Sequence, residues 1–234
     1  MSASWFRTQT RFLCLVAILV FIVTVVGPPQ PTGAETYIGG QIGLAFPRDV
    51  TSETITNAGA GVTKGAGVDY RTSAVYGAKV GHYLNSLRFL GAEIDYTLAN
   101  PHIRNKGVIA GERFRVHSIA FNLMARYPGE RFQPYIGAGP ALMIANISAP
   151  NPDVPPHTQW DTKLGFNAEM GLRYLISKNF SLFTEYKFNY AKFHYRETFN
   201  STPNFSGLNS FQAPYAAQHL MFGIAWNFES LFKR

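Results

Sequence analysis

Apolar and polar residues alternate one by one along most of this chain, and this period of two constrains the fold more than any other feature. Between Asp161 and Ile176 the even positions are apolar: Leu164, Phe166, Ala168, Met170, Leu172 and Tyr174. The odd positions between them are polar, charged or glycine. A helix would mix the two sets, whereas successive side chains of a strand point to opposite faces. The segment is therefore predicted to be a β-strand with one bulky apolar face.

The same alternation recurs along the rest of the chain. It predicts eight strands, at residues 37–46, 69–83, 88–99, 112–127, 133–147, 161–176, 181–190 and 216–228. Three connections are short (84–87, 128–131 and 177–179), and four are long (47–68, 100–111, 148–160 and 196–214). Short turns on one side and long loops on the other are typical of an outer-membrane barrel. We expect an all-β fold: an eight-stranded antiparallel up-and-down transmembrane β-barrel with both termini in the periplasm.

A soluble eight-stranded barrel that holds a ligand, such as a lipocalin, would alternate in the same way with its apolar face inward. Side-chain size and charge distinguish the two. The polar face here is rich in Gly and Ala, as suits a narrow interior, while the opposite face is bulky and nearly uncharged. Charged residues make up only 15% of the chain, against roughly 25% in soluble domains. These features favour lipid outside over a ligand inside.

The first 34 residues resemble an export signal. Two arginines precede a continuous apolar run from Phe12 to Val26, and Gly27-Pro28-Pro29 then breaks any helix. Thr32-Gly33-Ala34 supplies the small residues of a cleavage site. An uncleaved anchor is the alternative, but the apolar run is short for a membrane span. We predict that residues 1–34 are a cleaved signal peptide and that residues 35–234 form the barrel domain.

Charge and cysteine content narrow the classes of partner. The net charge is +7, which could indicate nucleic-acid binding, but the cations are scattered rather than clustered. We expect outer-membrane lipid as the partner and no nucleic acid. The only cysteine, Cys14, lies in the predicted signal peptide. A mature chain without it would have no disulfide and no thiolate metal site.

Several charged residues fall on the polar faces of the predicted strands and should lie inside the barrel. They are Arg71, Lys79, Glu93, Asp95, Arg126, Lys163, Glu169, Arg173, Glu185 and Lys187. The interior of an eight-stranded barrel is just wide enough for side chains to fill it. Opposite charges there should pair, because an unpaired buried charge costs several kcal/mol. We predict a network of ion pairs that plugs the lumen; a narrow porin-like channel for ions or small solutes is the alternative.

We expect no catalytic residues, no metal site and no cofactor. Some outer-membrane barrels are enzymes, for example those that modify lipid A, and these need a nucleophile beside a base. His117 and Ser118 are adjacent, so on a strand they point to opposite faces and cannot form such a pair. The glycines of residues 58–67 lie in a predicted loop with no following helix, unlike a phosphate-binding loop. A lipid A-modifying enzyme is therefore the least favoured alternative.

Cations also lie near the expected extracellular ends of the strands: Arg104, Lys106, Arg113, Arg115, Lys192 and Arg196. They could form an ordinary solvated rim or contact the phosphates of lipopolysaccharide. Near an anionic surface each cation would contribute about 1 kcal/mol. Arg113, Arg115 and Lys192 are the candidate lipopolysaccharide contacts. The long loops are rich in Ser, Thr, Asn and Gly and could bind a surface ligand.

Three stretches carry a resemblance to a known family: Phe132–Leu142, Gly165–Tyr186 and His219–Phe228. In these stretches the chain resembles the small eight-stranded outer-membrane β-barrel proteins, which include the OmpA membrane domain, OmpX and the opacity-type proteins. The resemblance implies an integral protein in the outer membrane of a Gram-negative-type bacterium. It also implies a structural or surface-interaction role rather than a specific activity.

The end of the last predicted strand is similar to the assembly signal of that family. Gly223, Trp226 and Phe228 have its spacing of glycine and two aromatic residues. The resemblance implies recognition by the barrel assembly machinery. In much of the family the final Phe ends the chain, whereas Glu229–Arg234 follow here.

Overall fold

The computed structural model describes residues 35–49, 54–57, 61–64, 70–101, 113–148, 158–196 and 209–229. The strands are β1 (Glu35–Pro47), β2 (Thr54–Asn57), β3 (Gly61–Lys64), β4 (Ser73–Tyr83), β5 (Leu90–Ala99), β6 (Arg113–Arg126), β7 (Phe132–Ser148), β8 (Thr158–Leu175), β9 (Phe180–Arg196) and β10 (Asn209–Glu229). Within these ranges no helix is long and apolar enough to cross a membrane. The predicted signal peptide, residues 1–34, lies outside the described residues.

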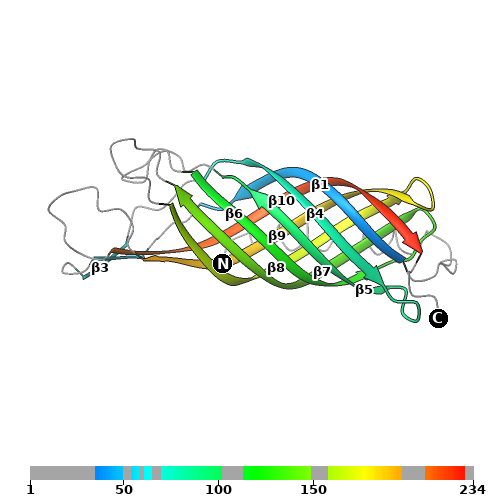
Figure 1. Ribbon diagram of the computed structural model, residues 1–234, viewed down its shortest axis with the longest axis horizontal. Helices are drawn as coiled ribbons and strands as arrows, with labels where there is room; N and C mark the ends of the chain where they lie inside the picture. The colour runs from blue at the N-terminus through cyan, green and yellow to red at the C-terminus, as the bar shows by residue number, and fades with distance from the viewer. Residues whose placement is uncertain are drawn as a thin grey trace, which may run out of the picture.

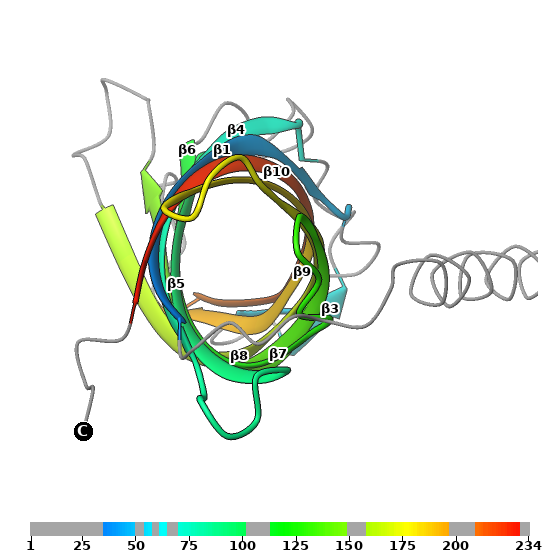
Figure 2. The ribbon, with the colours of Figure 1, turned by 90° about the vertical axis from the view of Figure 1, so that its right-hand side faces the viewer.

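Eight of these strands form a closed antiparallel barrel. Strands β1 and β4–β10 pair in sequence, and β1 also pairs with β10, which closes the ring. Figures 1 and 2 show this ring from the side and from one end. Each strand pairs antiparallel with the next one along the chain, which is the up-and-down topology. The predicted eight-stranded antiparallel barrel is confirmed.

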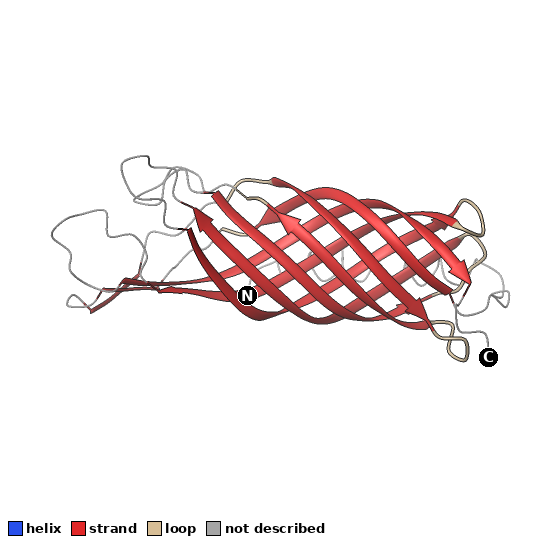
Figure 3. Ribbon diagram, viewed as in Figure 1, coloured by secondary structure: helices blue, strands red, loops and turns tan. Residues whose placement is uncertain are grey.

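The two ends of the barrel differ in their connections (Figure 3). At one end the strands are joined by short turns at residues 84–89, 127–131 and 176–179. The first and last residues of the barrel, Glu35 and Glu229, face each other at this same end. We call it the short-turn end, and the opposite one the long-connection end.

Strands β2 and β3 were not predicted and form a small hairpin within the predicted loop 47–68. Strand β2 pairs with residues Asn209–Gln212 of β10, which extends the sheet past the barrel at the long-connection end (Figure 1). Strand β9 extends to Arg196 and strand β10 begins at Asn209, so both are longer than predicted. In both segments the alternation continues with its phase reversed: Phe193 and Tyr215 are apolar and buried inside, whereas Lys192 is exposed and stands opposite Pro214 in the ladder.

The distribution of side chains is the reverse of that in a soluble protein. Large apolar residues lie on the outer surface: Leu164 is 75% exposed, Leu123 64% and Ile224 61%. Charged residues such as Lys187 and Glu185 are buried inside, although such groups are almost never fully buried unless paired. A row of exposed Leu, Ile and Phe around a closed barrel is the surface that lipid tails cover. The structure thus supports lipid outside the barrel, as the sequence predicted.

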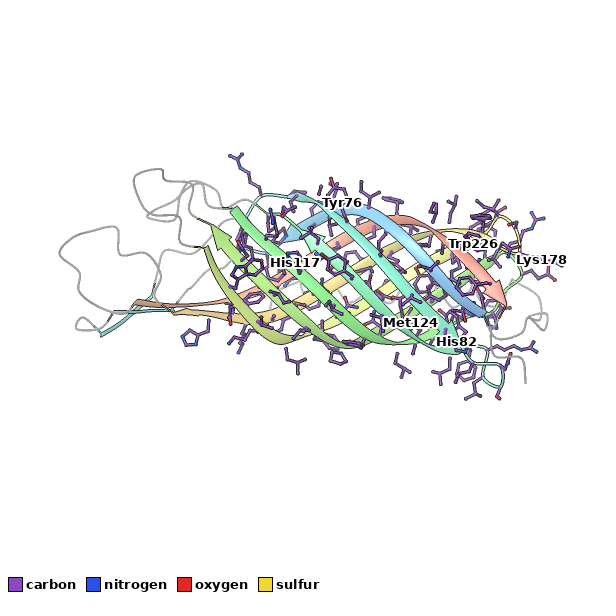
Figure 4. The ribbon with its side chains drawn as sticks, viewed as in Figure 1. Tyr76, His82, His117, Met124, Lys178 and Trp226 are labelled. Carbon is purple, nitrogen blue, oxygen red and sulfur yellow. The ribbon has the colours of Figure 1, made fainter. Side chains whose placement is uncertain are left out.

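Aromatic residues lie on the outer surface toward both ends. At the short-turn end Phe132 packs on Tyr174 and Phe180 stacks on Trp226, with ring centroids 4.9 and 5.6 Å apart. Figure 4 labels Trp226 near this end. Exposed aromatic residues nearer the long-connection end include Trp160. Two such belts mark the levels at which a barrel meets the two membrane surfaces.

Candidate functional site

The candidate site is a cluster of charged side chains in the middle of the barrel interior. We call it the central charge cluster; it consists of Lys79, Glu93, Asp95, Glu169, Glu185 and Lys187. These side chains come from β4, β5, β8 and β9, and each is at most 2% exposed. The alternation of the strands turns them inward, and the ladder sets Lys79 beside Asp95 and Glu169 beside Lys187.

Two lysines hold the cluster together. The Nζ of Lys79 lies 3.0 Å from Glu93 and 3.8 Å from Glu169, and it also contacts Glu185. The Nζ of Lys187 lies 3.3 Å from Glu169 and 3.1 Å from Glu185, and it also contacts Asp95. Both lysines therefore share Glu169 and Glu185. This sharing connects β4 and β5 to β8 and β9 across the interior.

Neutral side chains donate hydrogen bonds to three of the four carboxylates. The hydroxyl of Tyr37 donates to Glu93 at 2.5 Å, and the hydroxyl of Tyr135 donates to Glu185. The amide of Gln41 donates to Asp95 at 2.6 Å. These three residues were not predicted as part of the site. They occupy inward positions of β1 and β7, so the parity of the strands was the signal that could have identified them.

A second group of charges lies toward the short-turn end. The carboxylate of Glu35 contacts the guanidinium groups of both Arg126 and Arg173, the latter at 2.9 Å. The Arg126 guanidinium lies 3.7 Å from the ring centre of Tyr83, and that of Arg173 lies 4.1 Å from the ring centre of Tyr37. Both arginines were predicted to be inside the barrel. Glu35 was not, although it begins the predicted mature chain.

The interior toward the long-connection end is apolar. Phe114, Met143, Phe193 and Tyr215 are nearly fully buried there and pack with several alanines. The inner face was predicted to carry Gly, Ala and a few charges, and these larger apolar residues were not predicted there. These residues occupy positions of the strands that face the interior. Because they are apolar, the alternation of apolar and polar residues does not show that they face inward.

Two of the predicted lumen residues, Arg71 and Lys163, belong to neither of these groups of interior charges. Arg71 was predicted to face the lumen, but this is incorrect: its side chain is exposed, because β4 begins at Ser73 rather than at residue 69. Lys163 is half-buried, with a side chain 37% exposed, and pairs with Asp161 of the same strand at 3.3 Å.

The predicted lipopolysaccharide contacts do not form a single group. Arg115 is exposed on β6, and Lys192 is exposed on β9, which is three strands further around the barrel. The structure does not describe the side chain of Arg113, and Arg104 and Lys106 lie outside the described residues.

The chemistry that the central charge cluster supports is ion pairing. Oxygen atoms of Glu93, Asp95 and Glu169 lie within 4.8 Å of one another, a spacing that a metal ion could use. The ammonium groups of Lys79 and Lys187 already contact all three carboxylates. The pair His117 and Ser118 is divided by the barrel wall, since Ser118 is buried inside and His117 shares the outer face of β6 with the exposed Arg115.

The family whose profile matches this sequence is described as "Outer membrane protein beta-barrel domain", and the match covers residues 15–228. No curated protein sequence matches the chain. Among solved structures, the chain is similar to the outer membrane protein OprG from Pseudomonas aeruginosa (TM-score 0.64, 14% identity, 85% of this chain and 97% of that chain). It is also similar to outer membrane protein AlkL (TM-score 0.53, 14% identity, 89% and 97%) and to Neisserial surface protein A (TM-score 0.51, 16% identity, 84% and 100%). At 14–16% identity, the similarity to these three structures shows the fold alone.

Proposed function

Because the chain belongs to the outer-membrane β-barrel family, we propose that it is a closed barrel with a structural or surface-interaction role, and not a pore. The central charge cluster is the observation that carries this proposal. Six charged side chains from four strands meet inside the barrel with almost no exposed surface. To open a path for ions, contacts of both lysines would have to break, which would leave buried charges unpaired.

Electrical recordings test whether the lumen conducts. Purified protein inserted into planar lipid bilayers is expected to give no current steps across a range of voltages. A variant with both lysines changed, Lys79→Met and Lys187→Met, provides a comparison in which the cluster is disrupted. Stable, reproducible current steps from the unaltered protein would contradict the proposal and favour the alternative, a narrow channel for ions or small solutes.

We further propose that the short-turn end faces the periplasm, with both termini of the barrel, and that the long-connection end faces the outside. This is the usual arrangement for outer-membrane barrels. In a Cys14→Ser background, Asn204→Cys in a long connection should react with a membrane-impermeant maleimide on intact cells. Lys178→Cys in a short turn should react only after lysis. The reverse pattern would refute this orientation.

The remaining parts of the proposal concern partners and catalysis. We propose that the protein is not an enzyme, that its long loops bind any surface ligand, and that β10 is recognised by the barrel assembly machinery. Lipid A extracted from cells with and without the protein should have the same mass. A change in acyl chains or phosphates would instead support the least favoured alternative, a lipid A-modifying enzyme.

A further inference from the structure

Three rings form a row on the outer wall of the barrel toward the long-connection end. They belong to Tyr96 on β5, His117 on β6 and Trp160 on β8. The ring centroids of Tyr96 and His117 are 6.1 Å apart, and those of His117 and Trp160 are 6.4 Å apart, with planes inclined by about 30° in both pairs. The Tyr96 hydroxyl lies 2.9 Å from Nδ1 of His117, which fixes these two rings relative to each other. Figure 4 labels His117 on the barrel wall.

A cation lies beside this row. Arg115 precedes His117 by two residues, so both side chains are on the outer face of β6. Its guanidinium is exposed, and its Nε donates to Oδ1 of Asn100 at 3.1 Å. That hydrogen bond uses Nε, so it does not occupy the two terminal nitrogens of the guanidinium. The guanidinium of Arg is suited to paired hydrogen bonds with phosphate.

The strand ladders connect the cation to the last ring. Asn146 of β7 pairs with Arg115 on one side and with Trp160 on the other. Asn146 has outward parity, since its neighbour Ala145 is fully buried inside, yet Asn146 is only 7% exposed. A polar residue on the outer wall is thus covered by its surroundings, and Arg115 and Trp160 flank it. Tyr96, His117, Trp160 and Arg115 therefore form one continuous patch on the outer wall.

We propose that Arg115, His117, Tyr96 and Trp160 bind the phosphorylated glucosamine headgroup of lipid A. The row of rings offers aromatic faces to the sugar, and Arg115 offers its guanidinium to a phosphate. Aromatic residues on a barrel wall lie at the level of lipid headgroups. The inference rests on the orientation proposed above, because lipid A is found in the outer leaflet. It extends the predicted contact at Arg115 to three further residues and separates it from Lys192.

The fluorescence of Trp160 provides a direct test. The full chain has three tryptophans, so Trp5→Phe and Trp226→Phe leave Trp160 alone. This protein is folded into phosphatidylcholine vesicles with increasing amounts of bisphosphorylated lipid A. We expect a saturable change in Trp160 emission. Dephosphorylated lipid A and phosphatidylglycerol, which lack the phosphate and the sugar respectively, should both bind at least about tenfold more weakly, the loss expected for one charge-assisted hydrogen bond.

Variants separate the site from general charge attraction. Arg115→Gln is expected to weaken lipid A binding about tenfold, and His117→Ala should also weaken it. Lys178→Gln removes an exposed cation at the short-turn end and should leave binding unchanged. All three positions lie on the outside, and folding is checked by the heat-dependent shift in electrophoretic mobility. Equal binding by Arg115→Gln and Lys178→Gln, or equal binding of phosphatidylglycerol and lipid A, would overturn the proposal.

The vesicle experiment is independent of orientation. Lipid A is present in both leaflets of the vesicles, so a failure to bind refutes the site itself. A failure of the maleimide experiment on cells would refute the orientation and leave the vesicle result unaffected. Current steps in planar bilayers would refute the closed lumen and affect neither.

Discussion

Lys187 has a side chain with no exposed surface and contacts three carboxylates. A buried ion pair of this kind is expensive to break, because removal of one partner leaves the other charged and desolvated. The same reasoning does not extend to Lys163, whose side chain is 37% exposed and has Asp161 as its partner. An exposed pair contributes little, since water and salt screen it.

We therefore predict different effects for these two lysines. Lys187→Met should lower the free energy of unfolding by about 3–5 kcal/mol. Lys163→Met should lower it by less than about 1 kcal/mol. Urea unfolding of the protein in lipid vesicles, followed by tryptophan fluorescence, measures both. Similar losses for the two variants would show that the central charge cluster does not stabilise the barrel.

Glycines on the inner face of the strands make room for the rings that complete the site. A Cβ on Gly81 would lie 2.3 Å from the ring of Tyr37, its partner in the ladder. A Cβ on Gly171 would lie 2.5 Å from the ring of Tyr135, again its ladder partner. Each of these tyrosines donates its hydroxyl to a carboxylate of the central charge cluster. Glycine on one strand thus lets the neighbouring strand place a hydroxyl in the centre.

Gly81→Ala is expected to destabilise the barrel by about 1–3 kcal/mol, since the added methyl group displaces the ring of Tyr37. Gly40→Ala is the matched control, because nothing lies within 4 Å of its Cβ position. A surface change of that kind should fall within about 0.5 kcal/mol of the unaltered protein. The midpoint of urea unfolding measures both variants. A control that loses as much as Gly81→Ala would point to backbone effects instead of the ring contact.

The alternation of apolar and polar residues predicted the barrel strands because burial on one side of a strand leaves a clear pattern. It placed all six residues of the central charge cluster on the inner face for the same reason. It did not predict Tyr37 or Tyr135, because an aromatic residue reads as apolar whichever face it occupies. Arg71 was misplaced because alternation does not fix where a strand begins. The hairpin of β2 and β3 was missed because its pairing with β10 joins segments far apart in the chain.

The described barrel is a cylinder with large apolar side chains outside and the central charge cluster inside. Phe166 lies on the outer face of β8, 46% exposed, between Trp160 near one end and Tyr174 near the other. It should therefore face the middle of the lipid layer. Leu87 is equally exposed, at 45%, but it belongs to a short turn at the rim.

Phe166→Arg should cost about 2–4 kcal/mol of folding free energy in a bilayer, because arginine on the lipid face is most costly at mid-depth. Leu87→Arg should cost no more than about 1 kcal/mol, the value near a membrane surface. Folding of the urea-denatured protein into vesicles, measured over a series of urea concentrations, gives the two costs. Equal costs would mean that Phe166 does not meet hydrocarbon.

Closure of the ring joins the first barrel strand to the last, with Glu35 opposite Glu229. Until β10 has arrived, one border of β1 carries backbone groups without a partner, and such a border invites pairing with other chains. In a chain that is made from its N-terminus, all the barrel strands must therefore be protected from pairing with other chains until β1 and β10 can pair. The N- and C-terminal ends of the barrel are then neighbours, so a short peptide between them could yield a circular permutant with a new start in the turn at residues 127–131.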